Sequence, residues 1–301
     1  MSGTPRRMRL DEALAACGRE GLQAPPDDVV AQDVARALAE DIGDGDLSAA
    51  LLPDEPAVAR IISREDGIVC GLPWALRSFA ALDPDATFGL HVRDGETVIA
   101  NGTLLRVHAR SRALVTGERS ALNFLQLLSG VATRTGEFAA ALAGSRTRVL
   151  DTRKTIPGLR LAQKYAVRAG GGDNHRVGLY DAVLIKENHI AAAGSIAAAV
   201  GAARRRGAGH FIEVEVETLD ELAQALEAGA ERIMLDEFSD EDTRAAVALT
   251  AGRAALEISG NVSLETIGRM GTFGVDYVSV GALTKHVRAL DLSMRIVADD
   301  A

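Results

Sequence analysis

The spacing of apolar and polar positions changes halfway along the chain. In the second half, short runs of β-branched and aliphatic residues alternate with Ala-rich stretches that have helical spacing. The runs predict strands at residues 148–153, 182–187, 211–217, 232–237, 256–259 and 277–281. Strands and helices that alternate in this way indicate a parallel sheet, and a barrel is one of its two common forms. Because only six strands are visible, we expect an incomplete barrel.

Local helix signals support this division. Thr218 with Glu221 three residues later is typical of a capping box, and Ser239 can cap the next helix. Gly229 and Gly252 suit the positions that end helices. The helices between the strands therefore have predicted starts and ends.

The first half has a different pattern. Two helices, at residues 11–19 and 28–40, precede a set of antiparallel strands, and residues 111–142 form a long helical region. The strands are predicted at residues 57–69, 87–92, 97–100 and 103–109. Such hairpins also occur in biotinyl and lipoyl carrier domains. The first lysine of the chain is Lys154, so the first half has no residue for carrier attachment.

Composition excludes several classes of protein. The chain has 301 residues, 47% of them hydrophobic, and a formal net charge of -9, which argues against nucleic-acid binding. Cys17 and Cys70 are far apart, so neither a disulfide framework nor a zinc site is expected, and a cytoplasmic location fits. No apolar run approaches the roughly 20 residues of a membrane span. Residues 1–10 lack the apolar core of a signal peptide and predict a disordered start.

Positive charge concentrates in one segment of this acidic chain. Residues 151–190 contain Arg153, Lys154, Arg160, Lys164, Arg168, His175, Arg176 and Lys186. Cations gathered within an acidic protein indicate an anionic small molecule as the ligand. Only four of the 33 basic residues are lysines, which suggests that a compact ammonium is needed where they occur.

Polar residues follow the predicted strands at their carboxyl ends. They are Arg153, Lys154, Lys186, Glu187, Glu215, Asp236, Ser259 and Gly281. In an α/β barrel these ends converge on the face that holds the active site. Residues spread over the second half of the sequence are therefore expected to meet in one pocket.

The cations have several possible roles. Arg153, His175 and Arg176 could bind carboxylates, because guanidinium matches a carboxylate with two parallel hydrogen bonds. The alternative is a set of surface salt bridges with Asp173 and Asp181.

Lys154 and Lys186 are candidates for phosphate or pyrophosphate contacts. A Schiff-base role and a structural ion pair with an acid at a strand end remain alternatives for both lysines.

The acids and glycines at the strand ends suggest further contacts. Glu215 and Asp236, from adjacent strands, are typical of a Mg²⁺ site with substrate phosphates, or could stabilise a cationic sugar. Glu213, Glu215 and Glu217 share one strand face, so some of them could pair only with barrel cations.

Small residues allow backbone N–H groups to reach a phosphate. They are Ser259, Gly260, Asn261, Val280, Gly281 and Ala282. His189 is expected to be structural.

Taken together, these motifs resemble the quinolinate phosphoribosyltransferase family. The motifs are DTRKT (151–155), GGGDNHR (170–176), DAVLIKENHI (181–190), EVE (213–215), MLDEF (234–238), EISGN (257–261), VDYVSVGALT (275–284) and GERSALNFLQLLSGVATRT (117–135). The similarity runs from about residue 35 to the C-terminus.

The resemblance implies the fold of a type II phosphoribosyltransferase. It implies an N-terminal α/β sandwich domain at residues 1–130 and an incomplete, TIM-like α/β barrel at 131–283. A C-terminal helix at 284–301 would pack back on the first domain. It also implies a homodimer in which Arg119 completes the partner's site.

The resemblance further implies the chemistry. Quinolinate and phosphoribosyl pyrophosphate would give nicotinate mononucleotide, pyrophosphate and CO₂ in NAD biosynthesis, with Mg²⁺ and no organic cofactor. Thr152 joins Arg153, Lys154, His175 and Arg176 as substrate-binding residues. The catalytic residues would be Lys154, Lys186, Glu215 and Asp236. The two lysines would neutralise substrate anions, with Lys186 reaching the pyrophosphate, and the two acids would hold the ribose hydroxyls and the metal.

Three other functions compete with this one. They are a related enzyme for another aromatic acid, such as the relatives associated with molybdenum transport, a Schiff-base aldolase that uses Lys186, and a non-catalytic sugar-phosphate sensor. The intact set of Arg153, His175 and Arg176 favours quinolinate.

Overall fold

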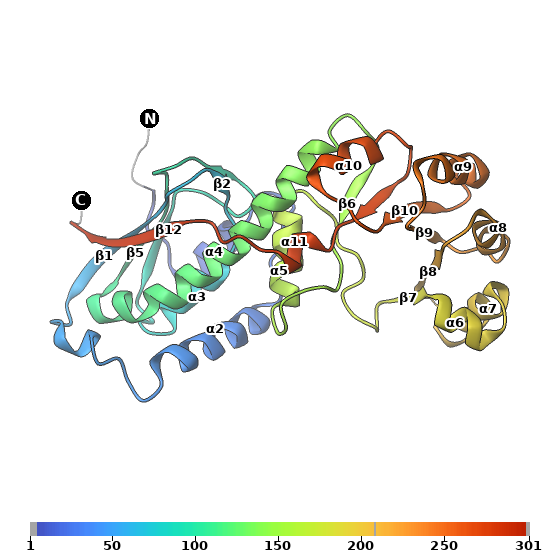
Figure 1. The fold of residues 1–301 in the computed structure, drawn as a ribbon. Helices are drawn as coiled ribbons and strands as arrows, with labels where there is room; N and C mark the ends of the chain where they lie inside the picture. Colours follow the sequence, from blue (N-terminus) through green and yellow to red (C-terminus); the bar gives the residue numbers. More distant parts are fainter. Residues whose placement is uncertain (1–4, 208, 299–301) are drawn as a thin grey trace. The chain divides into compact units, whose positions relative to one another are not determined.

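The computed structural model describes residues 5–207 and 209–298, which form two compact units (Figure 1). Unit 1 contains the chain up to Gly136, residues 156–171 and the segment from His286 onward. Unit 2 contains residues 137–155 and 172–285. The predicted division at residue 130 treats each domain as nearly continuous, whereas the chain passes between the units several times. Among the described residues, no helix is long and apolar enough to cross a membrane.

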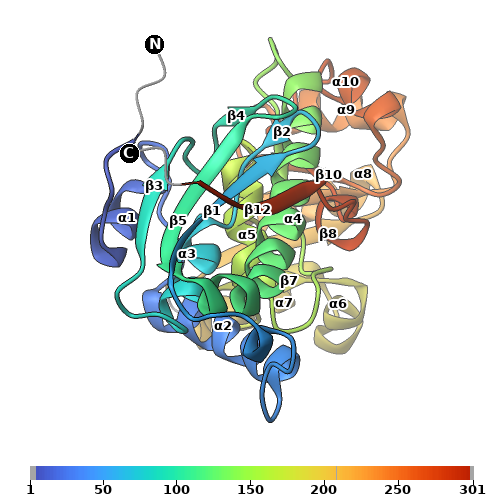
Figure 2. The ribbon, with the colours of Figure 1, turned by 90° about the vertical axis from the view of Figure 1, so that its left-hand side faces the viewer.

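Unit 1 is built on an antiparallel sheet with helices. The sheet has the order β12-β1-β5-β3, and Figure 2 looks onto it with α3 and α4 behind. Its strands are β1 (Pro56–Ser63), β3 (Thr87–Leu90), β5 (Thr103–Arg110) and β12 (Leu292–Val297); β2 (Gly67–Ile68) and β4 (Thr97–Val98) form a separate pair. The helices are α1 (Leu10–Ala16), α2 (Asp27–Ile42), η1 (Ala49–Leu51), α3 (Leu72–Ala80), α5 (Arg160–Ala169) and α4 (Ser111–Ala141), whose last residues belong to unit 2. Phe79, Phe88 and Leu105 are fully buried in its core.

Two expectations for the ends of the chain were wrong. The expected helix at 284–301 is a short helix, α11 (Ala282–Lys285), followed by β12, which pairs antiparallel with β1. Leu292 and Met294 alternate toward the core, and this period of two suits a strand. Residues 299–301 lie outside the described residues.

The expected disordered start is also corrected. Met8 exchanges two backbone hydrogen bonds of 2.9 Å with Phe88, and α1 begins at Leu10. Residues 1–4 of that segment lie outside the described residues. Helix α3 has no counterpart among the predicted elements.

Unit 2 is an open sheet of six parallel strands in the order β6-β11-β10-β9-β8-β7. The strands are β6 (Arg148–Leu150), β7 (Ala182–Ile185), β8 (Phe211–Val216), β9 (Arg232–Asp236), β10 (Ala255–Ser259) and β11 (Tyr277–Ser279). This is the order of a barrel that is open between its first and second strands, and it agrees with the incomplete barrel that the sequence predicted. Asp173 forms a parallel bridge with Leu150, so the chain before β7 runs along the outer edge of β6.

Helices follow the strands of unit 2. They are α6 (Glu187–Ala193), α7 (Ile196–Arg206), α8 (Leu219–Glu227), α9 (Asp240–Thr250) and α10 (Leu264–Met270). The predicted caps are present: Thr218 Oγ1 accepts the Glu221 N–H (3.2 Å), and Ser239 Oγ accepts the Asp242 N–H (3.1 Å). The Glu221 carboxylate accepts from Glu217 N–H, so the capping box is only half formed.

Strand register separates the sheet of unit 2 into two chemically different faces. Glu213 pairs with Arg232, and Asp236 pairs with Ser259, so these side chains share a face. Residues offset by one, such as Val214, Ile233 and Ile258, are buried on the other face. One face is therefore an apolar base for the helices, and the other collects the polar residues.

Candidate active site

Lys186 and Glu215 meet at the carboxyl edge of the polar face. The Lys186 Nζ ammonium donates to Glu215 Oε2 in an ion pair between the ends of β7 and β8. The Lys186 side chain is 43% exposed and that of Glu215 is 10% exposed, so the lysine can reach a ligand while the carboxylate stays anchored. Asp236 ends β9, the next strand.

Lys154, Thr152 and Gly281 are brought together where β6 and β11 end. The Lys154 N–H donates to Thr152 Oγ1 (3.1 Å), and the Lys154 carbonyl accepts from Thr284 Oγ1 (2.8 Å). A Cβ atom at Gly281 would lie 3.0 Å from Lys154 Cδ. Glycine at this position therefore leaves space for the lysine stem beside the backbone.

The loops after β9 and β10 have unusual backbone conformations. Gly260 has φ 103°, and the non-glycine residues Glu237 and Asn261 have φ 54° and 43°. Positive φ is uncommon outside glycine and is often held in place at functional sites. A Cβ at Gly260 would lie 3.2 Å from Glu237 Cγ, so the two loops pack closely.

The segment that carries Arg176 is fixed against β6. The buried Asp151 carboxylate accepts from the His175 N–H (2.8 Å) and from Asn174 Nδ2 (2.7 Å). Arg176 Nη1 donates to the Ala182 carbonyl (3.4 Å). Burial lowers the pKa of the Arg176 guanidinium, and the nearby Arg153 lowers it further. Two guanidinium groups whose charges act on each other create a region that favours an anion.

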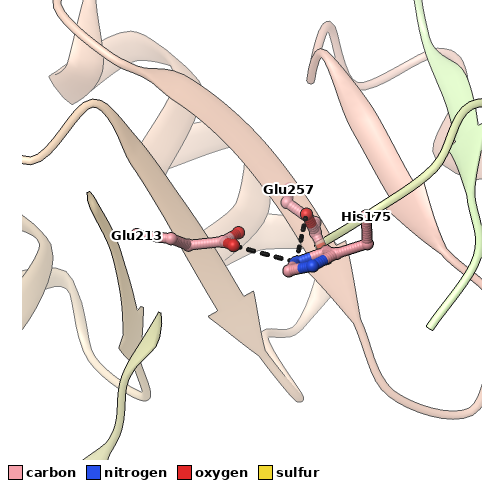
Figure 3. A group of neighbouring side chains, drawn as sticks. All are labelled: His175, Glu213 and Glu257. Atoms are coloured by element: carbon pink, nitrogen blue, oxygen red, sulfur yellow. Dashed lines mark ion pairs between the residues drawn. The ribbon is translucent and has the colours of Figure 1, made fainter. Parts of the chain in front are cut away.

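His175 lies inside the polar face and not at its edge (Figure 3). Its Nε2 atom is 2.8 Å from Glu213 Oε2 and 3.6 Å from Glu257 Oε2. Its Nδ1 atom accepts the Arg176 N–H (2.8 Å). Arg232 Nη1 lies 3.5 Å from Glu257 Oε2.

Burial changes the protonation of these acids. Burial, with a smaller contribution from Glu213, raises the pKa of Glu257 to about 8. Burial also raises the pKa of Glu213. The pair therefore holds a proton near neutral pH, and the Arg232 guanidinium balances the remaining negative charge.

The structure gathers most of the predicted site residues in unit 2. Thr152, Lys154 and Gly281 form one group, Lys186 and Glu215 another. Ser259, Gly260 and Asn261 follow β10, and Val280 and Ala282 flank Gly281 after β11. Arg119 is an exposed residue of α4 in unit 1, and its role remains a prediction.

Asp173 and Asp181, the alternative partners of the predicted acid-binding cations, make other contacts, and the charge of Asp181 also acts on Arg176. Asp173 forms its ion pair with Arg148, with Nη2–Oδ1 at 2.8 Å. Asp181 accepts the N–H groups of Val177 (2.6 Å) and Gly178 (2.9 Å). His189 Nδ1 accepts the Lys186 N–H (3.0 Å) at the start of α6, a structural contact of the kind expected for it.

Sequence reasoning gave no role to Asp151, Arg232 or Glu257. A charged residue inside an apolar strand, as in ALEIS, is a usable signal for Glu257. Arg232 begins its strand and looked like a surface charge.

Comparison with known proteins agrees with this geometry. The profile of the quinolinate phosphoribosyl transferase C-terminal domain matches residues 131–295, and that of the N-terminal domain matches residues 46–129. A probable carboxylating nicotinate-nucleotide pyrophosphorylase of Bacillus subtilis is 43% identical over 260 residues, which cover 85% of this chain and 90% of that protein. A decarboxylating quinolinate phosphoribosyltransferase of Nicotiana tabacum is 41% identical over 86% of this chain and 80% of its own length.

Solved structures show the same fold. The nicotinate-nucleotide pyrophosphorylase of Francisella tularensis superposes with a TM-score of 0.90 at 46% identity, covering 93% of this chain and all of that one. The enzyme of that name from Pyrococcus furiosus, at 15% identity and a TM-score of 0.63, shares the fold. The chain belongs to the quinolinate phosphoribosyltransferase family.

Proposed function

We propose that this protein transfers the phosphoribosyl group of phosphoribosyl pyrophosphate to quinolinate. The products are nicotinate mononucleotide, pyrophosphate and CO₂, a step of NAD biosynthesis. The observation that carries the proposal is the Lys186–Glu215 pair at the carboxyl edge of the sheet of unit 2, in a chain of this family. The same edge carries Asp236 and the glycine loops.

The acid would bind through Arg153 and Arg176, with Thr152 beside them. Two guanidinium groups suit the two carboxylates of quinolinate, because each can form paired charge-assisted hydrogen bonds. Burial, and after it the charge of Arg153, lowers the pKa of Arg176, and this supports the role because an anionic ligand relieves the repulsion between like charges.

Phosphoribosyl pyrophosphate would bind along the strand ends. Lys186 and Lys154 neutralise its anionic groups, and backbone N–H groups of Ser259, Gly260, Asn261, Val280, Gly281 and Ala282 bind the 5′-phosphate. Glu215 and Asp236 fit Mg²⁺, because two carboxylates from neighbouring strands lie on one face, and this ion takes few carboxylates together with substrate phosphates. Bound Mg²⁺ would supply charge neutralisation for the pyrophosphate, and no organic cofactor is needed.

The reaction then follows from position and charge. The pyridine nitrogen attacks the anomeric carbon, and the bond to pyrophosphate breaks with its electron pair leaving on oxygen. Glu215 and Asp236 stabilise positive charge on the ribose. The pyridinium nitrogen accepts the electrons released when the 2-carboxylate leaves as CO₂, and a proton then takes its place on the ring.

The ion pair argues against a Schiff-base aldolase. A Schiff-base lysine attacks as a neutral amine, whereas the contact with Glu215 engages the Lys186 side chain in an ion pair. Both cysteines are free and buried, which agrees with the cytoplasmic location proposed for the enzyme.

Purified protein should release nicotinate mononucleotide and CO₂ in equal amounts from quinolinate, phosphoribosyl pyrophosphate and Mg²⁺. Lys186→Met should lower kcat/KM about 100-fold, because one preorganised cation is lost. The exposed Lys285, which ends α11, provides a matched control, and Lys285→Met should behave as wild type. Wild-type protein with no product, or a fully active Lys186→Met, would refute the proposal.

We further propose a homodimer in which Arg119 enters the partner's acid site. Lys154→Ala and Arg119→Ala should each be nearly inactive, and mixed dimers should regain activity in one of their two sites. Mixed dimers of the two variants that recover no activity would refute the proposal that Arg119 completes the partner's site.

A further inference from the structure

His175 is held from two sides, and this defines the orientation of its ring. Its main chain is tied to β6, since its N–H donates to Asp151 Oδ1 (2.8 Å). Its side chain is only 9% exposed and points toward Glu213 and Glu257 from β8 and β10 (Figure 3).

The contacts of the ring engage both of its nitrogens. Nδ1 accepts the N–H of Arg176 at 2.8 Å, so it carries no proton in this arrangement. The other ring nitrogen, Nε2, lies 2.8 Å from Glu213 Oε2. Both ring nitrogens therefore face groups of the protein, and neither is presented to a substrate.

The two carboxylates are themselves held by the sheet. Glu213 is 2% and Glu257 0% exposed, so neither can touch a ligand directly. Arg232 reaches Glu257, and its guanidinium lies over the rings of Phe211 (4.9 Å) and Tyr277 (4.3 Å). Although His175, Glu213 and Glu257 have the composition of a metal site, the guanidinium already supplies the positive charge that the two acids need.

We propose that His175 is a positioning residue, in which Glu213 and Glu257 fix the imidazole so that its Nδ1 atom holds the main chain of Arg176 in place for the acid substrate. This proposal rests on the proposed function and deepens it. It assigns the buried acids of the sheet to acid recognition, and it changes the expected role of His175 from carboxylate ligand to support for Arg176.

The proposal can be tested with substitutions that separate the two nitrogens of the ring. Asparagine places an acceptor near the position of Nδ1, whereas alanine does not. His175→Ala should raise the KM and the calorimetric Kd for quinolinate about tenfold, with little change in kcat or in the KM for phosphoribosyl pyrophosphate. His175→Asn should restore most of the affinity.

Glu213→Gln is the second variant, because it acts at a residue that the substrate cannot reach. It should weaken quinolinate binding severalfold while the affinity for phosphoribosyl pyrophosphate stays the same. Glu231, an exposed acid just before β9 at the opposite end of the sheet, is the control, and Glu231→Gln should bind quinolinate as wild type does.

Three results would overturn the proposal. His175→Asn could be as impaired as His175→Ala, or Glu213→Gln could leave quinolinate affinity unchanged, while the wild-type protein still consumes quinolinate; either result leaves the proposed function intact. A wild-type protein that neither binds nor consumes quinolinate would overturn both this proposal and the function beneath it.

Discussion

Each unit of the molecule buries carboxylates, but the two units satisfy them differently. In unit 1, Asp94 is fully buried and accepts from the N–H groups of Gly71 (3.1 Å) and Leu72 (3.2 Å) and from the Tyr165 hydroxyl (2.8 Å). In unit 2, Glu213 and Glu257 face each other and His175, and Oε1 of each lacks a hydrogen-bond partner among the described residues.

This difference indicates that Asp94 stabilises the fold, whereas Glu213 and Glu257 serve a ligand site. Asp94 holds the start of α3 to α5 with a full set of donors, so its value lies in stability. An unsatisfied buried oxygen costs about 1–3 kcal/mol, and such a cost is tolerated where function needs the group. The acids of unit 2 are therefore expected to affect ligand binding more than Asp94 does.

The largest loss of stability is expected when Arg232, the cation beside Glu213 and Glu257, is removed. Arg232→Met leaves two buried acids without their counter-charge, so the free energy of unfolding should fall by about 3–5 kcal/mol in urea titrations. Adding Glu257→Gln should recover part of that loss. A loss below about 1 kcal/mol would mean that Arg232 does not balance the pair.

Asp94→Asn should lower the free energy of unfolding by about 2–3 kcal/mol, because an amide cannot accept from all three donors. The kcat of the folded protein should not change. Asp85, whose side chain is 90% exposed, offers the control, and Asp85→Asn should unfold as wild type does. A change in the quinolinate affinity of Asp94→Asn would contradict the view that Asp94 serves only stability, in contrast to the acids of unit 2.

The pH dependence of stability should distinguish Glu257 from its amide. Burial raises the pKa of Glu257 from 4.5 to about 8, so the folded state binds more protons than the unfolded state between these values. Its contribution to stability is full below about pH 4.5 and is lost as the pH rises toward 8, at up to about 1.4 kcal/mol per pH unit. Glu257→Gln should therefore gain stability relative to wild type from pH 5 to pH 8, whereas a constant difference would contradict the assignment.

The smallest effect is expected at Tyr165. Tyr165→Phe removes one of three donors to Asp94 and should cost about 1 kcal/mol in the same titrations. Tyr180→Phe is the matched control, because Tyr180 is 73% exposed. A loss equal to that of Asp94→Asn would show that Tyr165 alone holds the carboxylate.

Strand ends were predictable because the geometry of a parallel sheet is local and regular. The alternation in FIEVEV correctly placed Glu213 and Glu215 on one face, and the chain order correctly placed Glu215 and Asp236 on adjacent strands. These inferences needed only a period of two and the convergence of strand ends.

The rest depended on contacts between distant residues. The orientation of His175 is set by Asp151 and by acids on two other strands, and no spacing near His175 reveals it. Strand β12 forms only because β1 offers it an edge, and its six residues alone do not decide between strand and helix.

The most direct test of the central claim compares quinolinate with nicotinate as acid substrates of the wild-type protein. Turnover with phosphoribosyl pyrophosphate and Mg²⁺ should occur with quinolinate and release CO₂, and nicotinate should give little product, because paired guanidinium groups require both carboxylates. Equal or faster turnover of nicotinate would contradict the proposed acid site and leave only phosphoribosyl transfer.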